Sequence, residues 1–104
     1  MRLALFQDAA AADVLPGVIT DRGIVDVSDP APRGHSPQAT MTAIIDDFER
    51  LRSKLEARAR DGDARPLSEV RLRPPLPRPG KMLACIANYW EHSGLEERPL
   101  IMFL

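Results

Sequence analysis

The longest regular pattern of apolar residues in the chain runs from about residue 41 to residue 60. Its apolar side chains recur at helical spacing along one stripe: Met41, Ile44, Ile45, Phe48, Leu51, Leu55 and Ala59. Thr40 or Thr42 can cap the start of this helix, and Gly62 is a natural stop. The pattern therefore predicts one amphipathic helix, Met41 to Arg60, whose stripe packs on a core.

Shorter apolar runs before this helix predict β-strands. Residues 3–6 read as a first strand, whereas the alanine-rich stretch 8–14 fits either a loop or one helical turn. Two β-branched runs, at 18–20 and 24–27, flank a short turn that contains a glycine able to adopt a positive φ, so we expect a β-hairpin there. Residues 28–39 are turn formers almost throughout, and we expect a surface loop.

The pattern after the helix predicts three further strands and one connector. Val70 and Leu72 alternate with charged residues, which indicates a half-buried strand. The motif PPLPRPG at 74–80 ends that strand, because proline fixes φ and cannot donate to a ladder. The uncharged run from Met82 to Ala87 favours a buried strand over a helix. A last strand is predicted for the apolar run at 100–104.

These elements indicate an α+β protein with a domain boundary in the proline-rich connector. Residues 1–73 are expected to form a small N-terminal α+β domain made of a β-hairpin and the helix. Residues 74–104 would then hold the connector and the opening strands of a second, β-rich domain. The last predicted strand needs a neighbour for its edge and for its apolar side chains. On that ground we expect the sequence to be the front part of a longer, truncated chain.

Composition and charge narrow the classes of function. The net charge of −1 gives no electrostatic footprint for nucleic acid or for an anionic membrane surface, so neither partner is expected. No apolar run approaches the length of about 18 residues that a membrane-spanning helix needs. The single cysteine cannot build a disulfide framework, which fits a reducing cytoplasm. The sequence contains neither zinc-spaced cysteine and histidine residues nor a glycine-rich phosphate loop.

A cluster of polar and aromatic residues follows the strand predicted at Met82–Ala87. It consists of Asn88, Tyr89, Trp90, Glu91 and His92. The end of a buried strand can direct such side chains into a cleft. His92 can accept or donate a proton near neutral pH, although a histidine on a surface loop would fit the same sequence. We interpret the cluster as a site rather than as ordinary surface.

Other candidate groups have simpler structural interpretations. Cys85 lies inside an apolar run and is expected to be an inert core thiol. His35 has no companion at metal-ligand spacing and is expected to be exposed. Asp46 and Asp47 fall on the polar side of the predicted helix, where solvated carboxylates are expected. Trp90 is expected to pack on the neighbouring strand.

The order Pro79-Gly80-Lys81, an apolar strand and then Asn88-Tyr89-x-x-His92 resembles the opening of the catalytic domain in the fumarylacetoacetate hydrolase family. The stretches MRLALF at 1–6 and DRGIVDVSD at 21–29 resemble that family's small leading domain. Within this resemblance, only the pattern at residues 79–92 is specific to the family. Ala87 departs from the family pattern, which usually has glycine before the asparagine.

The resemblance implies a hydrolase that cleaves a carbon–carbon bond in an acylpyruvate-like 1,3-dicarbonyl substrate. His92 would be the catalytic proton-transfer residue, and Asn88 and Tyr89 would bind the substrate. Glu96 would orient His92 as its catalytic partner, with Glu97 as a competitor for this role. Some family members space their histidine and glutamate three residues apart, so Glu96, four residues after His92, departs from that spacing by one.

The same resemblance implies a divalent cation, Mg²⁺ or Mn²⁺, that polarises the substrate oxygens as a Lewis acid. Its carboxylate ligands are expected beyond Leu104. The family fold is a β-roll-rich catalytic domain, usually in a homodimer, and its substrates are small oxo-acids. An isomerase or decarboxylase of the same family and a non-catalytic α+β packing or assembly module stay open as alternatives. A Glu-x-Glu pair and a later aspartate in the downstream coding sequence would favour the enzyme.

Overall fold

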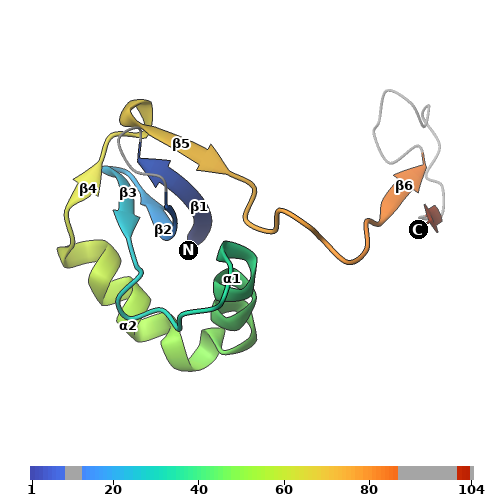
Figure 1. Ribbon diagram of the computed structural model, residues 1–104, viewed down its shortest axis with the longest axis horizontal. Helices are drawn as coiled ribbons and strands as arrows, with labels where there is room; N and C mark the ends of the chain where they lie inside the picture. The colour runs from blue at the N-terminus through green and yellow to red at the C-terminus, as the bar shows by residue number, and fades with distance from the viewer. Residues whose placement is uncertain (9–12, 87–100, 104) are drawn as a thin grey trace, which may run out of the picture.

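The computed structural model describes residues 1–8, 13–86 and 101–103. A five-stranded antiparallel sheet carries two helices, and a proline-rich connector leads from it to a two-stranded sheet (Figure 1). The predicted α+β class is confirmed.

The larger sheet has the spatial order β4-β3-β2-β1-β5, and every neighbouring pair is antiparallel. Its strands are β1 (Arg2–Asp8), β2 (Val14–Thr20), β3 (Gly23–Asp26), β4 (Ala64–Arg65) and β5 (Val70–Arg73). The expected hairpin is formed by β2 and β3. Gly23 begins β3 with φ 126°, and a Cβ there would lie 2.2 Å from the carbonyl oxygen of Arg65. Both the turn and this close approach therefore require glycine.

The sheet is strongly curved, because its two edge strands are joined by a very short link. Residues 66–69 connect β4 to β5 and include the 3₁₀ turn η1 (Leu67–Glu69). In a flat sheet four strand spacings of about 4.8 Å would separate these edges, about 19 Å in all. Such a link, partly wound at about 2 Å per residue, spans less than that distance. Accordingly, Arg65 on β4 reaches across three strand spacings to Asp8 on β1, with a nitrogen–oxygen distance of 2.5 Å.

The concave face of the sheet has its own small apolar cluster. Ala4, Phe6 and Ile24 are buried there. Gly17 leaves room for two of them, since a Cβ at this position would lie less than 3 Å from Ile24 and Phe6. The guanidinium of Arg65 covers the ring of Phe6 at 5.8 Å from its centroid, which is a cation–π geometry.

The helix predicted from Met41 to Arg60 is in fact two helices. They are α1 (Pro37–Asp46) and α2 (Phe48–Asp61), and they cover the face of the sheet opposite the concave one (Figure 1). Asp47 separates them with φ −110° and ψ 22°, which lies outside the helical range. The prediction of one continuous helix is therefore wrong at Asp47. No helix in the described part of the chain is long and apolar enough to cross a membrane.

Helix α1 begins earlier than the apolar pattern indicated. The hydroxyl of Ser36 accepts a hydrogen bond from the backbone N–H of Ala39 at 3.1 Å, and Pro37 occupies the first turn. Ser36 is therefore the N-cap, and the predicted caps Thr40 and Thr42 are wrong. The last residues of the predicted 28–39 loop belong to this helix instead.

The main core lies between the two helices and the sheet. Its buried members are Val18, Val27, Ile44, Leu51, Leu55 and Ala59. Phe48 is half-buried against this cluster, whereas Ile45 is 48% exposed. The predicted stripe is thus wrong for Ile45, which lies in the last turn of α1 outside the face that Met41 and Ile44 bury.

Arg22, in the turn between β2 and β3, ties the hairpin to the end of α2. Its guanidinium donates hydrogen bonds to the carbonyl oxygens of Ala59, Arg60 and Gly62 at 3.1, 2.6 and 3.3 Å. The last carbonyls of a helix lack intrahelical partners and carry partial negative charge, so a cation is favourable there. One side chain thereby caps α2 and fixes its position on the sheet.

The connector and the second sheet complete the described chain. Strand β5 has the predicted position, but Leu72 is 46% exposed although Val70 is half-buried. Met82 and Leu83 are also largely exposed, so the strand expected from Met82 begins only at Ala84. That strand, β6 (Ala84–Ile86), pairs antiparallel with β7 (Ile101–Phe103).

Candidate functional site

The residues expected to form the catalytic site lie outside the described part of the chain. They are Asn88, Tyr89, His92 and Glu96. The strands on either side are described, and Ile86 at the end of β6 is the register partner of Ile101 at the start of β7. The segment 87–100 therefore connects two paired strands. The roles assigned to its residues stay predictions.

Three further predictions also concern residues outside the described part. They are the packing of Trp90, the competition of Glu97 with Glu96, and the conformation of residues 9–12 within the alanine-rich stretch 8–14. Cys85 lies within β6, and the burial of its thiol likewise stays a prediction.

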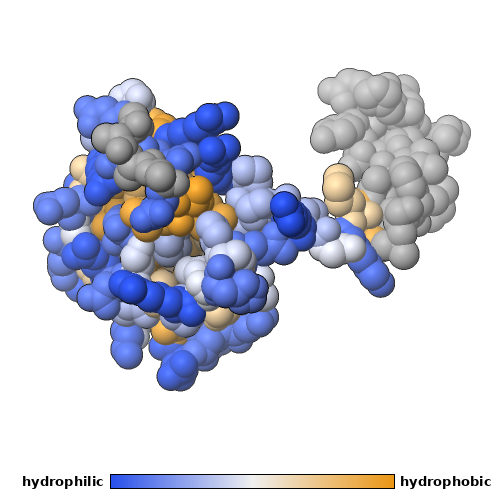
Figure 2. All heavy atoms as spheres, in the orientation of Figure 1, coloured by the Kyte–Doolittle hydropathy of each residue, from blue (hydrophilic) through white to orange (hydrophobic). Residues whose placement is uncertain are grey.

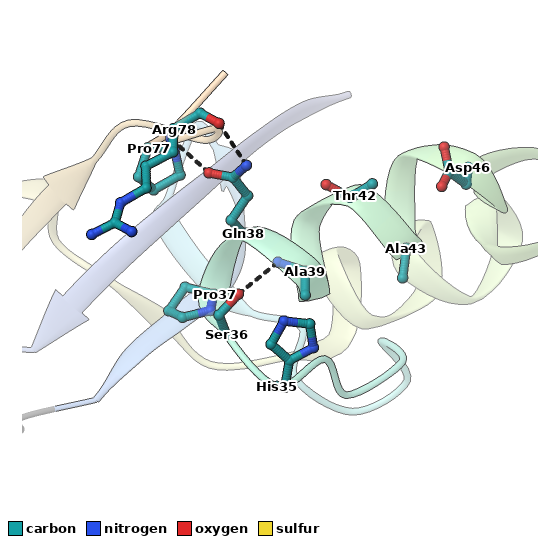
Figure 3. Close-up of a pocket in the computed structure, with 10 residues that line it drawn as sticks. All are labelled: His35, Ser36, Pro37, Gln38, Ala39, Thr42, Ala43, Asp46, Pro77 and Arg78. Carbon is teal, nitrogen blue, oxygen red and sulfur yellow. Dashed lines mark hydrogen bonds between the residues drawn. The ribbon is translucent and has the colours of Figure 1, made fainter. Parts of the chain in front are cut away.

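A groove of about 790 Å³ lies in the described part of the chain, between α1 and the connector. One wall is the exposed side of α1 with the two residues before it, and the other wall is Pro77 and Arg78 (Figure 3). Pro37, Ala39 and Ala43 give the helical wall an apolar character. The groove can hold a small molecule or an extended segment by shape, so its polar groups decide its chemistry.

The titratable side chains of the groove do not form a catalytic pair. His35 and Asp46 are both exposed, which confirms the prediction for His35. His35 precedes the start of α1, whereas Asp46 is its last residue. They are therefore at least about 13 Å apart along the helix axis. Figure 3 shows them at opposite ends of the drawn part of α1. Acid–base catalysis by a histidine and an orienting carboxylate requires direct hydrogen-bond contact, so these two residues do not supply it.

Gln38 makes the most specific polar contacts of the groove. Its side-chain amide donates a hydrogen bond to the carbonyl oxygen of Arg78 at 2.7 Å and accepts one from the N–H of Arg78 at 2.6 Å (Figure 3). No role for Gln38 was predicted from the sequence. A signal was nevertheless present, because Arg78 stands between two prolines and so keeps a backbone donor where its neighbours have none.

The described residues do not fit a site for Mg²⁺ or Mn²⁺. Such a cation needs several oxygen ligands that converge on one point. Residues 1–8, 13–86 and 101–103 contain no group of three or more histidine, cysteine, aspartate or glutamate side chains able to hold a metal ion. Four of their carboxylates are paired with guanidinium groups instead: Asp8 with Arg65, Asp47 with Arg50, Glu56 with Arg52 and Asp61 with Arg60.

The clearest electrostatic effects in the described part are on the helix surface. The hydrogen bond from Arg50 lowers the pKa of Asp47 and, together with the positive charge of Arg50, outweighs the opposing effect of desolvation. The same pair raises the pKa of Arg50, and the hydrogen bond to Glu56 raises the pKa of Arg52. These pairs lie three and four residues apart along α2, where they support the helix.

Comparisons of the chain with family models, with curated proteins and with solved structures found no match. The family likeness therefore depends on the residues at 79–92 themselves and on the elements around them.

Proposed function

We propose that this chain belongs to the fumarylacetoacetate hydrolase family and takes part in cleaving a carbon–carbon bond of an acylpyruvate-like substrate. The observation that carries the proposal is the position of β6. This strand follows the Pro79-Gly80-Lys81 turn and ends directly before Ala87-Asn88-Tyr89, so the residue order of the family's catalytic opening coincides with a strand and its exit. A polar segment that leaves a strand in this way is a suitable place for chemistry.

In the proposed reaction His92 moves protons and the substrate supplies the electron sink. The imidazole takes a proton from water as the water oxygen adds to the acyl carbonyl carbon. The bond between the acyl carbon and the central carbon then breaks, and its electron pair forms the enolate of the pyruvate half. His92 returns the proton to the carbon of this enolate, which becomes the methyl group of pyruvate. The products are a carboxylic acid and pyruvate. Glu96 would steady the charged imidazole, and Asn88 and Tyr89 would donate hydrogen bonds to substrate oxygens.

The family's divalent cation, Mg²⁺ or Mn²⁺, would polarise the substrate oxygens when bound. The described residues do not supply its ligands, and we expect these ligands elsewhere. The proposal also includes a homodimer in the cytoplasm, with a small oxo-acid as substrate and neither nucleic acid nor a membrane as partner. The single cysteine supports the cytoplasm, and the near-zero net charge supports the absence of nucleic acid and membrane partners. The homodimer and the oxo-acid substrate follow from the family resemblance alone.

The test is an assay of the full-length protein, as its gene encodes it, with an acylpyruvate. In the presence of Mg²⁺ or Mn²⁺ we expect equal amounts of pyruvate and the carboxylic acid, and loss of activity in excess chelator. Pyruvate without the acid would point to another reaction of the same family. Absence of any product with intact, folded protein would contradict the proposed activity.

A second candidate function is a non-catalytic packing or assembly module. The observation in its favour is that residues 1–8 and 13–73 form a closed globule whose described side chains include no metal-binding group. Calorimetric titration of residues 1–104 with Mg²⁺ tests whether these residues alone bind the cation that the proposed hydrolase needs. We expect no saturable micromolar binding, because hard cations need converging oxygen ligands. Saturable binding together with acylpyruvate cleavage would show that these residues already form a complete enzyme.

A further inference from the structure

The proline-rich connector is attached to α1 at one residue, through the side-chain amide of Gln38. The amide uses both its donor and its acceptor on the backbone of Arg78, at 2.7 and 2.6 Å. A neighbouring β-strand would engage the same two backbone groups in the same way. We infer that Gln38 is a latch that fixes the connector on the first domain, and with it the part of the chain that leads to β6.

The spacing of the prolines makes the latch selective for Arg78. Prolines occupy positions 74, 75, 77 and 79, so within 74–79 only Leu76 and Arg78 have a backbone N–H. A slip of one residue would place a proline opposite the amide and lose the bond to its oxygen. A residue before proline is also restricted to extended conformations, in which its N–H and C=O face the same side. Arg78 is therefore held ready for a two-point contact.

The contact recognises the backbone of the connector rather than the side chain. The guanidinium of Arg78 points away from the Gln38 amide (Figure 3), and neither hydrogen bond involves it. Because prolines on both sides restrict the chain, fixing Arg78 also restrains its neighbours. The latch joins the two parts of the chain, and its role does not depend on which reaction the segment 87–100 supports.

The first test compares Gln38→Ala with the unmodified chain by NMR. Loss of the amide should raise the exchange rate of the Arg78 backbone N–H about fivefold, the factor that one hydrogen bond of ordinary net strength provides. The order parameters of the Lys81 and Leu83 amides should fall together with this protection. Arg78→Ala is the matched control, because it keeps both backbone groups and should leave the protection unchanged. Equal exchange in Gln38→Ala and the unmodified chain would overturn the inference.

Gln38→Glu tests the two halves of the latch separately. The carboxylate keeps an acceptor for the Arg78 N–H but has no hydrogen to donate to the Arg78 carbonyl. We expect continued protection of that N–H, while the carbonyl ¹³C shift of Arg78 moves to its value in Gln38→Ala. A variant indistinguishable from Gln38→Ala at the Arg78 amide would contradict a two-point contact. Gln38 lies near the surface at the start of α1, and circular dichroism of each variant verifies that the helices are retained.

Discussion

At the scale of single residues, the apolar stripe of the helical region contains positions of very unequal burial. Leu55 has no exposed surface, whereas Ile45 is 48% exposed. Leu55→Ala should lower the free energy of unfolding by about 2–5 kcal/mol, because it removes buried contacts and leaves a cavity. Ile45→Ala should change it by less than about 1 kcal/mol. Urea melts of the two variants measure the difference, and equal losses would show that Ile45 also faces a core.

The pKa of the Asp47 carboxylate depends on a neighbouring guanidinium group. The hydrogen bond from Arg50 lowers its pKa. The stabilisation from this pair is therefore fully present above the ordinary aspartate pKa of about 3.9 and is lost as the pH falls through the lowered value. An NMR titration should find Asp47 below the ordinary value. Arg50→Ala should return it there, and an unchanged titration in that variant would refute this cause.

At the scale of elements, the start of α1 depends on one hydroxyl. Ser36→Ala removes the hydrogen bond to the N–H of Ala39 and should lower the free energy of unfolding by about 1 kcal/mol. Thr42→Ala is the matched control, because Thr42 is exposed within the helix, whereas the side-chain cap of α1 comes from Ser36. Thermal or urea unfolding compares the two. A larger loss in Thr42→Ala would return the cap to the position that the apolar pattern suggested.

The type of most elements could be predicted from the sequence, but several boundaries could not. The hairpin was predictable because its β-branched runs flank a glycine turn. The N-terminal half of β2 was missed, since Pro16 and Gly17 are poor strand formers and are held there by pairing with β1. The break at Asp47 was missed because a lone aspartate lowers helix propensity much less than proline does. The apolar spacing of 3.6 residues also continues in the sequence even where the helix axis changes direction.

At the scale of the whole molecule, the curvature of the sheet depends on contacts that no local pattern reveals. The connection of β4 to β5 by residues 66–69 brings the two edges together, and Arg65 then reaches both Phe6 and Asp8. The latch likewise joins two residues that are far apart in the sequence, because Gln38 and Arg78 are separated by 40 positions. Sequence spacing alone does not place such partners side by side, whereas the family-like run at 79–92 could be found because it is contiguous.

The measurement that tests the central claim most directly is the turnover number of His92→Ala in the full-length protein with an acylpyruvate. If His92 transfers the proton, its removal should lower turnover by about 10²- to 10⁴-fold. His35→Ala is the matched control, because His35 is the other histidine of the sequence and is exposed beside α1, and it should keep full activity. Near-normal turnover in folded His92→Ala would contradict the assignment of the catalytic residue and, with it, the proposed chemistry.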